Sequence, residues 1–297
     1  MDQYAIQDPT KQYQQPDIPA DQMQPEPGLD AKLQPQADHG EKTYRGTGRL
    51  KGRKALVTGA DSGIGRAIAI AYAREGADIV LSYLPSEQVD ATKALDSIEQ
   101  AGQKAIAVPG DITNEDFCQG LIDKAIQELG SLDILVNNAG KQVHVDDIAK
   151  LTTGQFIKTF ETNVYAMFWL SKFALPHMPP GATIINTTSI QAYQPSPGLI
   201  DYASTKGAIV TFTKGLAMQL APKGIRVNAV APGPVWTPLQ PSQGQPPEKL
   251  PKFGEHTPLG RTGQPAELAP AFVFLASQES SYTTGEILGV TGGQLLP

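Results

Sequence analysis

The sequence predicts an α/β fold in which helices cover both faces of one parallel sheet, the doubly wound arrangement. Short apolar runs alternate with segments of helical periodicity from Gly52 onward. Gly59, Gly63 and Gly65 separate the first apolar run from the first helical segment. Small polar residues follow the third, fourth and fifth runs, where ligands bind in such sheets. The length of 297 residues, 40% of them hydrophobic, allows one large domain or two small ones.

Residues 1–48 differ in composition from the rest of the chain. Gln, Pro and Asp dominate, and large aliphatic residues are too sparse to give helical or strand periodicity. We interpret this segment as an extended arm. Two alternatives stay open: a disordered tail, or an arm that packs along its own or a neighbouring subunit. The residues that could anchor it are Tyr4, Tyr13, Ile18, Leu29, Leu33 and Tyr44.

Residues 49–297 are expected to form the domain itself. The expected strands are the apolar runs Ala55–Val57, Ile79–Leu81, Ala105–Val108, Ile134–Val136, Thr183–Ile185, Val227–Val230 and Ile287–Val290. The expected helices are Gly63–Glu75, Glu87–Ala101, Glu115–Leu129, Thr153–Leu175, Tyr202–Ala221 and Ala266–Ser277. Strands joined by helices of this length are parallel, so seven of them make one twisted sheet.

The turn after the first strand indicates a phosphate site. A glycine has no Cβ to keep the backbone away from a pyrophosphate, and the unpaired amides of a helix N-terminus attract its charge. The alternative is a tight turn without a ligand, because glycines also serve turns for steric reasons. A P-loop is excluded because no Lys followed by Ser or Thr closes the glycine pattern of Thr58–Arg66.

Composition excludes several classes of partner. A net charge of -6 and a pI near 5.3 argue against nucleic acid and anionic membranes as partners. No apolar run is long enough to span a membrane, and the first residues do not resemble a signal peptide. Cys118 is the only cysteine, so we expect no internal disulfide and a cytoplasmic location.

The histidines and serines favour neither a metal enzyme nor a hydrolase. The four histidines lack the spacing of metal ligands, so we expect no metal site. No Gly-x-Ser-x-Gly segment supports a hydrolase. The histidines are His39, His144, His177 and His256.

The segment from about 232 to 258 is rich in Pro, Gln and Gly and is longer than most connections, which is typical of a substrate loop or lid. Trp236, Leu239 and Phe253 give it apolar anchors. An exposed loop without a role is the alternative.

Tyr202 and Lys206 are four residues apart in an expected helix, so both side chains project from one face. A phenol has a pKa of about 10, and a nearby ammonium favours its ionised form. Ser189 follows the fifth strand and could donate a hydrogen bond to the same substrate oxygen. On its own, such a pair is more common as an ordinary helix surface.

Several separated motifs together resemble the short-chain dehydrogenase/reductase family, of the compact type. They are Thr58-Gly-Ala-Asp-Ser-Gly-Ile-Gly65, Asp111, Asn137-Asn-Ala-Gly140, Asn163, Ser189, Tyr202-Ala-Ser-Thr-Lys206 and Pro232-Gly233, in the family's order and approximate spacing. The resemblance extends from Gly52 to the C-terminus. It implies a Rossmann-type fold and hydride transfer between a nicotinamide and a carbonyl carbon.

The resemblance also implies a role for each catalytic residue. Tyr202 is the general acid or base, and Ser189 positions the substrate oxygen. Lys206 lowers the pKa of the tyrosine and holds the nicotinamide ribose, while Asn163 helps a water relay protons to Lys206. The implied cofactor contacts are Gly59, Ser62, Gly63, Ile64, Gly65, Ser82, Asp111, Ile112, Asn138, Ala139, Gly140, Tyr202, Lys206, Pro232, Gly233, Val235 and Thr237.

The end of the second strand gives little indication of NAD against NADP. Ser82 is not an acid that would bind a ribose 2′-hydroxyl, and Leu84 stands where a base often binds the phosphorylated cofactor. Asp61 and Ser62 supply no base either. We expect a slight preference for NADP with some use of NAD.

Three further stretches resemble a narrower bacterial branch that carries the same arm and includes stress-associated oxidoreductases and an aldehyde reductase. They begin at Ser189, Ala231 and Gly263, and the last contains Pro270, which could kink its helix. Gln191, Tyr193 and Trp236 are expected to line the substrate pocket, which suits small aldehydes, ketones, sugars or polyols.

The resemblance implies a homotetramer, as relatives often form. A catalytically idle dinucleotide sensor whose arm binds a partner protein is the alternative function, against which Ser189, Tyr202 and Lys206 count. An epimerase or dehydratase of the extended relatives is disfavoured, because little chain follows the seventh strand.

Overall fold

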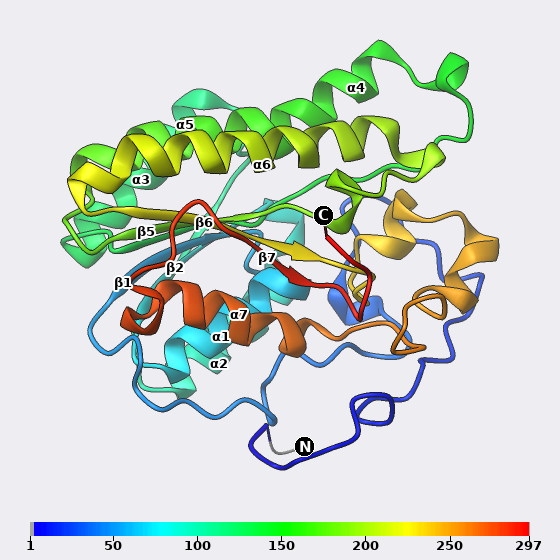
Figure 1. Ribbon diagram of the computed structural model, residues 1–297, viewed down its shortest axis with the longest axis horizontal. Coiled ribbons are helices and arrows are strands. Elements are labelled where there is room, and N and C mark those ends of the chain that lie inside the picture. The colour runs from blue at the N-terminus through cyan, green and yellow to red at the C-terminus, as the bar shows by residue number, and fades with distance from the viewer. Residues whose placement is uncertain (1–2, 297) are drawn as a thin grey trace.

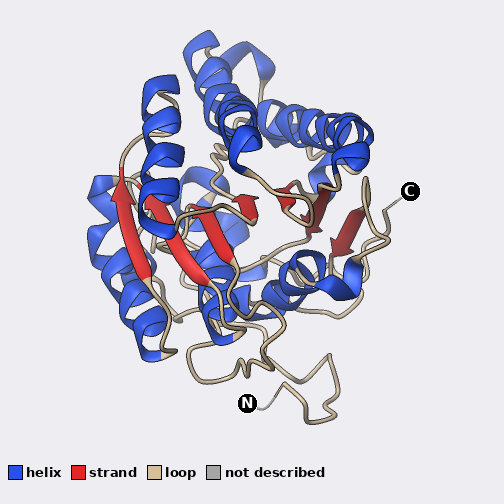
Figure 2. Ribbon diagram, turned by 90° about the vertical axis from the view of Figure 1, so that its left-hand side faces the viewer, coloured by secondary structure: helices blue, strands red, loops and turns tan. Residues whose placement is uncertain are grey.

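The computed structural model describes residues 3–296 and contains one parallel sheet between two layers of helices (Figures 1 and 2). The strand order is β3-β2-β1-β4-β5-β6-β7, and every neighbouring pair is parallel. The strands are β1 Lys54–Thr58, β2 Asp78–Tyr83, β3 Ala105–Pro109, β4 Ile134–Asn137, β5 Thr183–Thr187, β6 Arg226–Pro232 and β7 Ile287–Val290. The predicted doubly wound, Rossmann-type fold is confirmed.

The helices are α1 Gly63–Arg74, α2 Gln88–Gln100, α3 Glu115–Leu129, α4 Thr153–Phe160, α5 Ala166–Ala174, α6 Ile200–Leu220 and α7 Pro265–Ala276. The expected helix at 153–175 is divided, because a π-type turn over Glu161–Tyr165 joins α4 to α5. Pro270 does not end α7, which continues to Ala276. No helix of residues 3–296 combines the length and apolar character needed to cross a membrane.

Alternation along the strands divides the core into two layers. Ala55 and Val57 of β1 face the layer of α1, α2 and α7, while Leu56 faces the layer of α3, α5 and α6. The same period of two recurs in β2 and β4. Each fully buried aliphatic side chain stabilises the fold by roughly 1.5–3 kcal/mol, so register along the sheet is strongly specified.

The order of the strands fixes where a ligand can bind. The chain runs outward from β1 to β3 on one side and from β4 to β7 on the other, so the direction of winding reverses between β1 and β4. Crevices at such a reversal, outside the carboxyl ends of the strands, are the usual ligand sites.

The arm packs against its own chain. It passes below α7 and beside the segment that follows β6 (Figure 1). Ile18 and Leu33 of the arm form a small apolar cluster with Trp236 and Leu250. Tyr44 joins the core beneath α1, whereas Tyr4 is 56% exposed.

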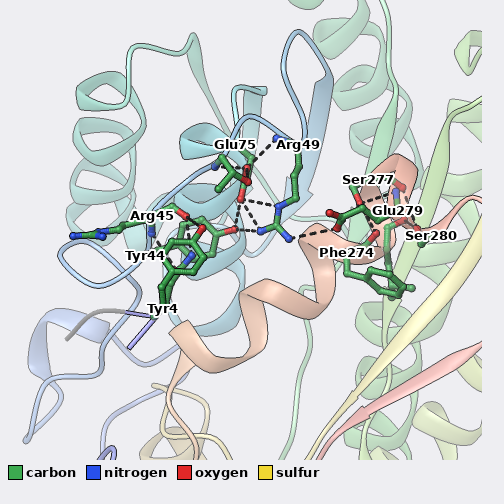
Figure 3. Close-up of polar contacts among 12 residues, drawn as sticks. Tyr4, Tyr44, Arg45, Arg49, Glu75, Phe274, Ser277, Glu279 and Ser280 are labelled. Atoms are coloured by element: carbon green, nitrogen blue, oxygen red, sulfur yellow. Dashed lines mark hydrogen bonds and ion pairs between the residues drawn. The ribbon is translucent and has the colours of Figure 1, made fainter. Parts of the chain in front are cut away.

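Polar contacts fix the end of the arm to the C-terminal end of α1 (Figure 3). The Tyr44 hydroxyl donates to Glu75 Oε1 at 2.7 Å, and the Arg49 guanidinium binds the same carboxylate at 2.7 Å. Burial alone would raise the pKa of Glu75, but hydrogen bonds from Arg49 and Tyr44 outweigh it and lower that pKa to about 2. Arg49 also lies 3.6 Å from Glu279, beyond α7.

Candidate active site

A cavity of about 360 Å³ opens beyond the carboxyl ends of β1 to β6, at the position that the strand order predicts. Its wall combines the glycine turn after β1, the segments that follow the other five strands, and one face of α6. Every residue expected to contact a cofactor lines this cavity except Gly65.

The glycine turn is shaped by close approaches of the backbone. Gly59 has φ +61°, and a Cβ there would lie 3.0 Å from the Ala139 Cα. A Cβ on Gly65 would lie 1.9 Å from the carbonyl oxygen of Gly59, so this glycine lets α1 pack against the turn and does not face the cavity. Gly63 and Ile64, the first residues of α1, line the cavity, and a helix N-terminus suits a phosphate group.

Asn138 connects the glycine turn to the two neighbouring strands. Its Nδ2 donates to the carbonyl oxygens of Thr58 at 3.2 Å and Gly59 at 3.3 Å, and its Oδ1 accepts from Thr187 Oγ1 at 3.2 Å. These bonds satisfy a polar group at the base of the cavity and hold three strand ends in one arrangement.

Tyr202 and Lys206 lie on the first two turns of α6 and are both buried. The Lys206 Nζ donates to the Thr187 carbonyl oxygen at 2.8 Å and lies 5.3 Å from the centroid of the Tyr202 ring. The spacing of four therefore places both side chains on one face, as the sequence predicts.

Burial controls the charge of both groups. It raises the pKa of Tyr202 to about 12, an effect that a hydrogen bond with the Ser189 side chain partly offsets. Burial lowers the pKa of Lys206 to about 7. Burial and the Ser189 hydrogen bond account for the shift of Tyr202, so the expected lowering of its pKa by Lys206 stays a prediction.

Asn163 lies in the π-type turn, behind the cavity wall. Its Nδ2 donates to the Lys141 carbonyl oxygen at 2.9 Å and to Thr205 Oγ1 at 3.0 Å. Its Oδ1 accepts from the Lys141 amide at 2.7 Å. Both amide hydrogens are used, while Oδ1 keeps a second lone pair, and the role of Asn163 in a water relay to Lys206 stays a prediction.

Of the three expected substrate contacts, only Gln191 lines the cavity. Trp236 is fully buried, and its Nε1 donates to the carbonyl oxygen of Pro35 in the arm at 2.8 Å. Tyr193 packs against Ala229, Ala231 and Ile287. The prediction that Trp236 and Tyr193 line the pocket is therefore corrected, because both rings are used in packing.

Asp111 is half-exposed on the cavity rim. Its Oδ1 accepts from the Thr113 amide at 2.9 Å, and its Oδ2 lies 3.5 Å from Lys158 Nζ. Burial would raise its pKa, but the bonds from Thr113 and the charge of Lys158 lower it, so Asp111 is ionised at neutral pH.

Sequence reasoning missed two groups of lining residues. Asp61 and Glu87 bring carboxyl groups to the β2 end of the cavity, and the arm adds Glu26, Pro27 and Gly28 to its lining. An acid between two glycines was a visible signal for Asp61. No local pattern indicated that the arm reaches the cavity, because its place depends on contacts with residues more than 200 positions away, such as Trp236.

The histidines do not form a metal site. Within residues 3–296, no group of three or more His, Cys, Asp or Glu side chains is arranged to hold a metal ion. His39 is buried, with Nε2 at 3.2 Å from Asp30 and Nδ1 at 3.3 Å from Glu41. It therefore belongs to an ion-pair network that holds the arm.

Comparisons with known proteins agree with this geometry. Residues 59–294 match the family model described as enoyl-(acyl carrier protein) reductase. The chain is 60% identical to the uncharacterised oxidoreductase YghA of Escherichia coli, covering 98% of this chain and 99% of that protein.

Two plant proteins and one solved structure are also similar. Identity is 42% to the glucose and ribitol dehydrogenase of Daucus carota, covering 94% and 97% of the two chains. It is 41% to the chloroplastic NADPH-dependent aldehyde reductase 1 of Arabidopsis thaliana, covering 91% and 96%. A short chain dehydrogenase from Burkholderia cenocepacia, solved in complex with NADP, gives a TM-score of 0.77 at 33% identity, covering 82% and 98%.

Proposed function

Because the chain belongs to the short-chain dehydrogenase/reductase family, we propose that this oxidoreductase transfers a hydride between a nicotinamide dinucleotide, NADP(H) or NAD(H), and a small carbonyl or alcohol substrate. One observation carries the proposal. Tyr202, Ser189 and Lys206 line the same cavity as the glycine turn, so acid–base groups and a phosphate site share one enclosure.

The cavity fits a dinucleotide in two respects. Gly59 and Gly63 line the cavity beside the N-terminus of α1, where a Cβ on either would lie 3.0 Å from an atom of Ala139 or Thr237, so this close-packed turn needs glycine. Two buried polar atoms on the wall, Asp61 Oδ2 and Ser82 Oγ, have no hydrogen-bond partner in the protein, as expected of groups that bind a ligand. When bound, the nicotinamide supplies or accepts the hydride.

The protein's own residues control the proton and the position of the substrate oxygen. The raised pKa of Tyr202 keeps its phenol protonated at neutral pH, the form needed to donate a proton to a carbonyl oxygen during reduction. Ser189 Oγ accepts from the Gln191 amide at 3.2 Å, which directs its hydroxyl. Lys206, fixed by the Thr187 carbonyl, holds a second exchangeable proton beside the phenol.

The substrate class rests on the lining and on the relatives. Apolar Ile190 and Leu199 lie beside polar Ser189 and Gln191 on the wall near Tyr202. Such a mixture suits small polar carbonyl compounds. The names of the carrot and Arabidopsis relatives support sugars, polyols and aldehydes as the classes to test.

A turnover panel tests the proposal. Purified protein with NADPH or NADH is offered short aldehydes, ketones and sugars, and the oxidised cofactors are offered polyols. We expect turnover of at least one class, and Tyr202→Phe should lower kcat about 100- to 10,000-fold while cofactor affinity is retained. Tyr193→Phe, outside the cavity, is the matched control and should keep kcat. Tight cofactor binding without any turnover would favour a dinucleotide sensor instead.

We also propose a homotetramer in the cytoplasm. Support for assembly comes from apolar side chains exposed on α4, the π-type turn and α5, namely Phe156, Ile157, Tyr165 and Phe168. Sedimentation of the wild type against Phe168→Glu tests this, because a charge in a buried interface should shift the protein toward smaller species. Support for the compartment comes from the single cysteine of the sequence, Cys118, which is buried and free.

A further inference from the structure

Glutamine side chains gather on one side of the cavity. They belong to the segments that follow β4, β5, β6 and β7, the strands on one side of the reversal in winding. Within residues 3–296, none of the cavity residues that follow β1, β2 or β3 is a glutamine. The amides therefore lie away from the glycine turn and on the side of Ser189 and Tyr202, which both follow β5. We name these residues the amide wall: Gln142, Gln191, Gln240, Gln245 and Gln294.

Gln240 carries a buried carbonyl oxygen that the fold leaves unsatisfied. The residue is 7% exposed, and its Oε1 has no hydrogen-bond partner among residues 3–296. The Oε1 atom of Gln294 is likewise buried and without a partner in this part of the chain. An unpaired buried polar atom is costly, and in native structures such an atom usually awaits a ligand or water. Both oxygens therefore call for a ligand group that donates hydrogen bonds.

The segments that carry these two glutamines leave the sheet side by side. Pro232 of β6 is paired in register with Val290 of β7, and the Gly233 amide donates to the Val290 carbonyl oxygen at 2.9 Å. A Cβ on Gly233 would lie 2.7 Å from Thr291, so the two strand exits are in close contact. A ligand beside Tyr202 that extends past β6 therefore meets both segments.

Two other members of the amide wall are each held at one end. Gln142 Nε2 donates to the Gly244 carbonyl oxygen at 2.7 Å, and Gln191 Oε1 accepts from the Ser196 amide at 2.7 Å. A side-chain amide has one donor end and one acceptor end, so fixing one end sets the direction of the other. Hydroxyl groups suit such a wall, because a hydroxyl both donates and accepts.

The lysines of the cavity already have partners. Lys141 pairs with Glu26 of the arm, and Lys158 pairs with Asp111. The third, Lys206, donates to a backbone carbonyl oxygen. No arginine lines the cavity in the described range of 3–296. A neutral substrate is therefore favoured over one with a phosphate or carboxylate group of its own.

We propose that the amide wall binds a neutral polyhydroxylated substrate, a sugar or a polyol, through its hydroxyl groups. Gln240 then distinguishes this substrate from an alkyl compound of the same length, because a site built to hydrogen-bond a hydroxyl rejects an analogue that lacks it. This proposal rests on the proposed function and narrows its substrate class.

Two pairs of compounds with equal carbon number test the proposal. Glyceraldehyde is compared with propanal, using reduced cofactor, and ribitol with pentan-1-ol, using oxidised cofactor. The ratio of kcat/KM within each pair is measured for the full-length wild type and for Gln240→Met, which keeps the length of the side chain but removes its amide. Both proteins meet the same solution forms of each compound, so the change in the ratio reports the site alone.

We expect the wild type to favour the hydroxylated member at least about tenfold in one pair. Gln240→Met should reduce that ratio about tenfold, mainly by raising KM for the hydroxylated compound, and should leave the alkyl compound nearly unchanged. Gln294→Met should change the ratio in the same direction by less, because Gln294 is only half-buried.

Gln100→Met is the matched control. Gln100 is exposed on α2 and does not line the cavity, so this variant should keep the wild-type ratio. A second readout is the dissociation constant of NADPH, which should stay within about twofold in Gln240→Met. An equal loss of affinity for NADPH and for the hydroxylated compound would mean that Gln240 binds cofactor, and it would overturn the proposal.

The outcomes separate this proposal from the proposed function. If the wild type turns over only alkyl compounds, or turns them over as well as the hydroxylated ones, the proposal is overturned while the proposed function stands. The same follows if Gln240→Met and Gln100→Met change the ratio equally. If no carbonyl compound or alcohol is turned over, the proposed function fails. The wild-type ratio and Gln294→Met decide the proposal if Gln240→Met does not fold.

Discussion

The sheet domain and the arm are held by different interactions. In the domain, strand residues alternate between two apolar layers, so every strand specifies its own register. In the arm, few apolar side chains are buried, and the segment is fixed by single anchors and a network of charges. The difference teaches that a strand can be recognised from its own apolar pattern. The conformation of the arm cannot, because it depends on contacts with residues far away in the chain.

The network of the arm is buried and balanced. Arg66 of α1 lies 3.2 Å from Asp30 Oδ2 and 2.8 Å from Glu41 Oε1, and His39 lies between the same two acids. Burial alone would lower the pKa of His39, but hydrogen bonds to Asp30 and Glu41 raise it to about 9. His39 is therefore protonated at neutral pH and, together with Arg66, lies against the carboxylates of Asp30 and Glu41.

Loss of the apolar anchor of the arm, Trp236, should have the largest effect on the free energy of unfolding. Trp236→Ala should lower the free energy of unfolding by about 3–5 kcal/mol, because it opens a cavity beside Ile18 and Leu33. Denaturant unfolding measures the loss, and hydrogen exchange should show faster exchange in the arm than in the sheet. Trp236→Phe keeps most of the packing but loses the N–H that binds the Pro35 carbonyl, so it should cost less, about 1–2 kcal/mol. An arm that stays protected in Trp236→Ala would contradict the anchoring role.

Removing one charge of the ion-pair network should lower the free energy of unfolding by somewhat less than Trp236→Ala does. Asp30→Asn leaves Arg66 and His39 with Glu41 as their remaining counter-ion, and we expect a loss of about 2–3 kcal/mol in the free energy of unfolding. The control is Asp21→Asn, an exposed acid of the same arm, which should change stability by under about 0.5 kcal/mol. Equal effects of the two variants would show that the network does not hold the arm.

The network also makes the arm sensitive to alkaline pH. Folding raises the pKa of His39 from an ordinary value near 6.5 to about 9, so its stabilisation is fully present below pH 6.5 and is lost as the pH rises through about 9. We expect protection of the arm from proteolysis to fall between pH 8 and 10 by the equivalent of about 1–2 kcal/mol. His39→Gln should remove this dependence, and an unchanged pH profile in that variant would refute it.

Asp61, a buried acid of the sheet domain, should have the opposite effect on stability: removing its charge should stabilise the fold at high pH. Because the pKa of Asp61 is raised, its ionisation destabilises the folded state as the pH rises from about 4 to about 7. Asp61→Asn should therefore increase the free energy of unfolding by about 1 kcal/mol at pH 8 and leave it unchanged near pH 4. Thermal unfolding at the two pH values measures this, and destabilisation of Asp61→Asn at pH 8 would mean that the hydrogen bonds of Asp61 with Ser62 and the backbone outweigh the cost of its burial.

The sheet was predictable because short apolar runs that alternate with segments of helical periodicity are local signals. All seven strands and the strand exits followed from them, including Asn138 and Ser189. The place of Trp236 was not predictable, because an aromatic ring in a loop can face either a ligand or the arm. The charge state of Lys206 was not predictable either, because it depends on burial.

The central claim is that hydride transfer in this cavity depends on Tyr202. The most direct measurement follows deuterium from the C4 position of reduced cofactor into the product of the best substrate in the panel. The account predicts one deuterium on the former carbonyl carbon per turnover in the wild type, and none at a comparable rate in Tyr202→Phe that still binds cofactor. Deuterium found in solvent instead of product, or wild-type turnover in Tyr202→Phe, would contradict it.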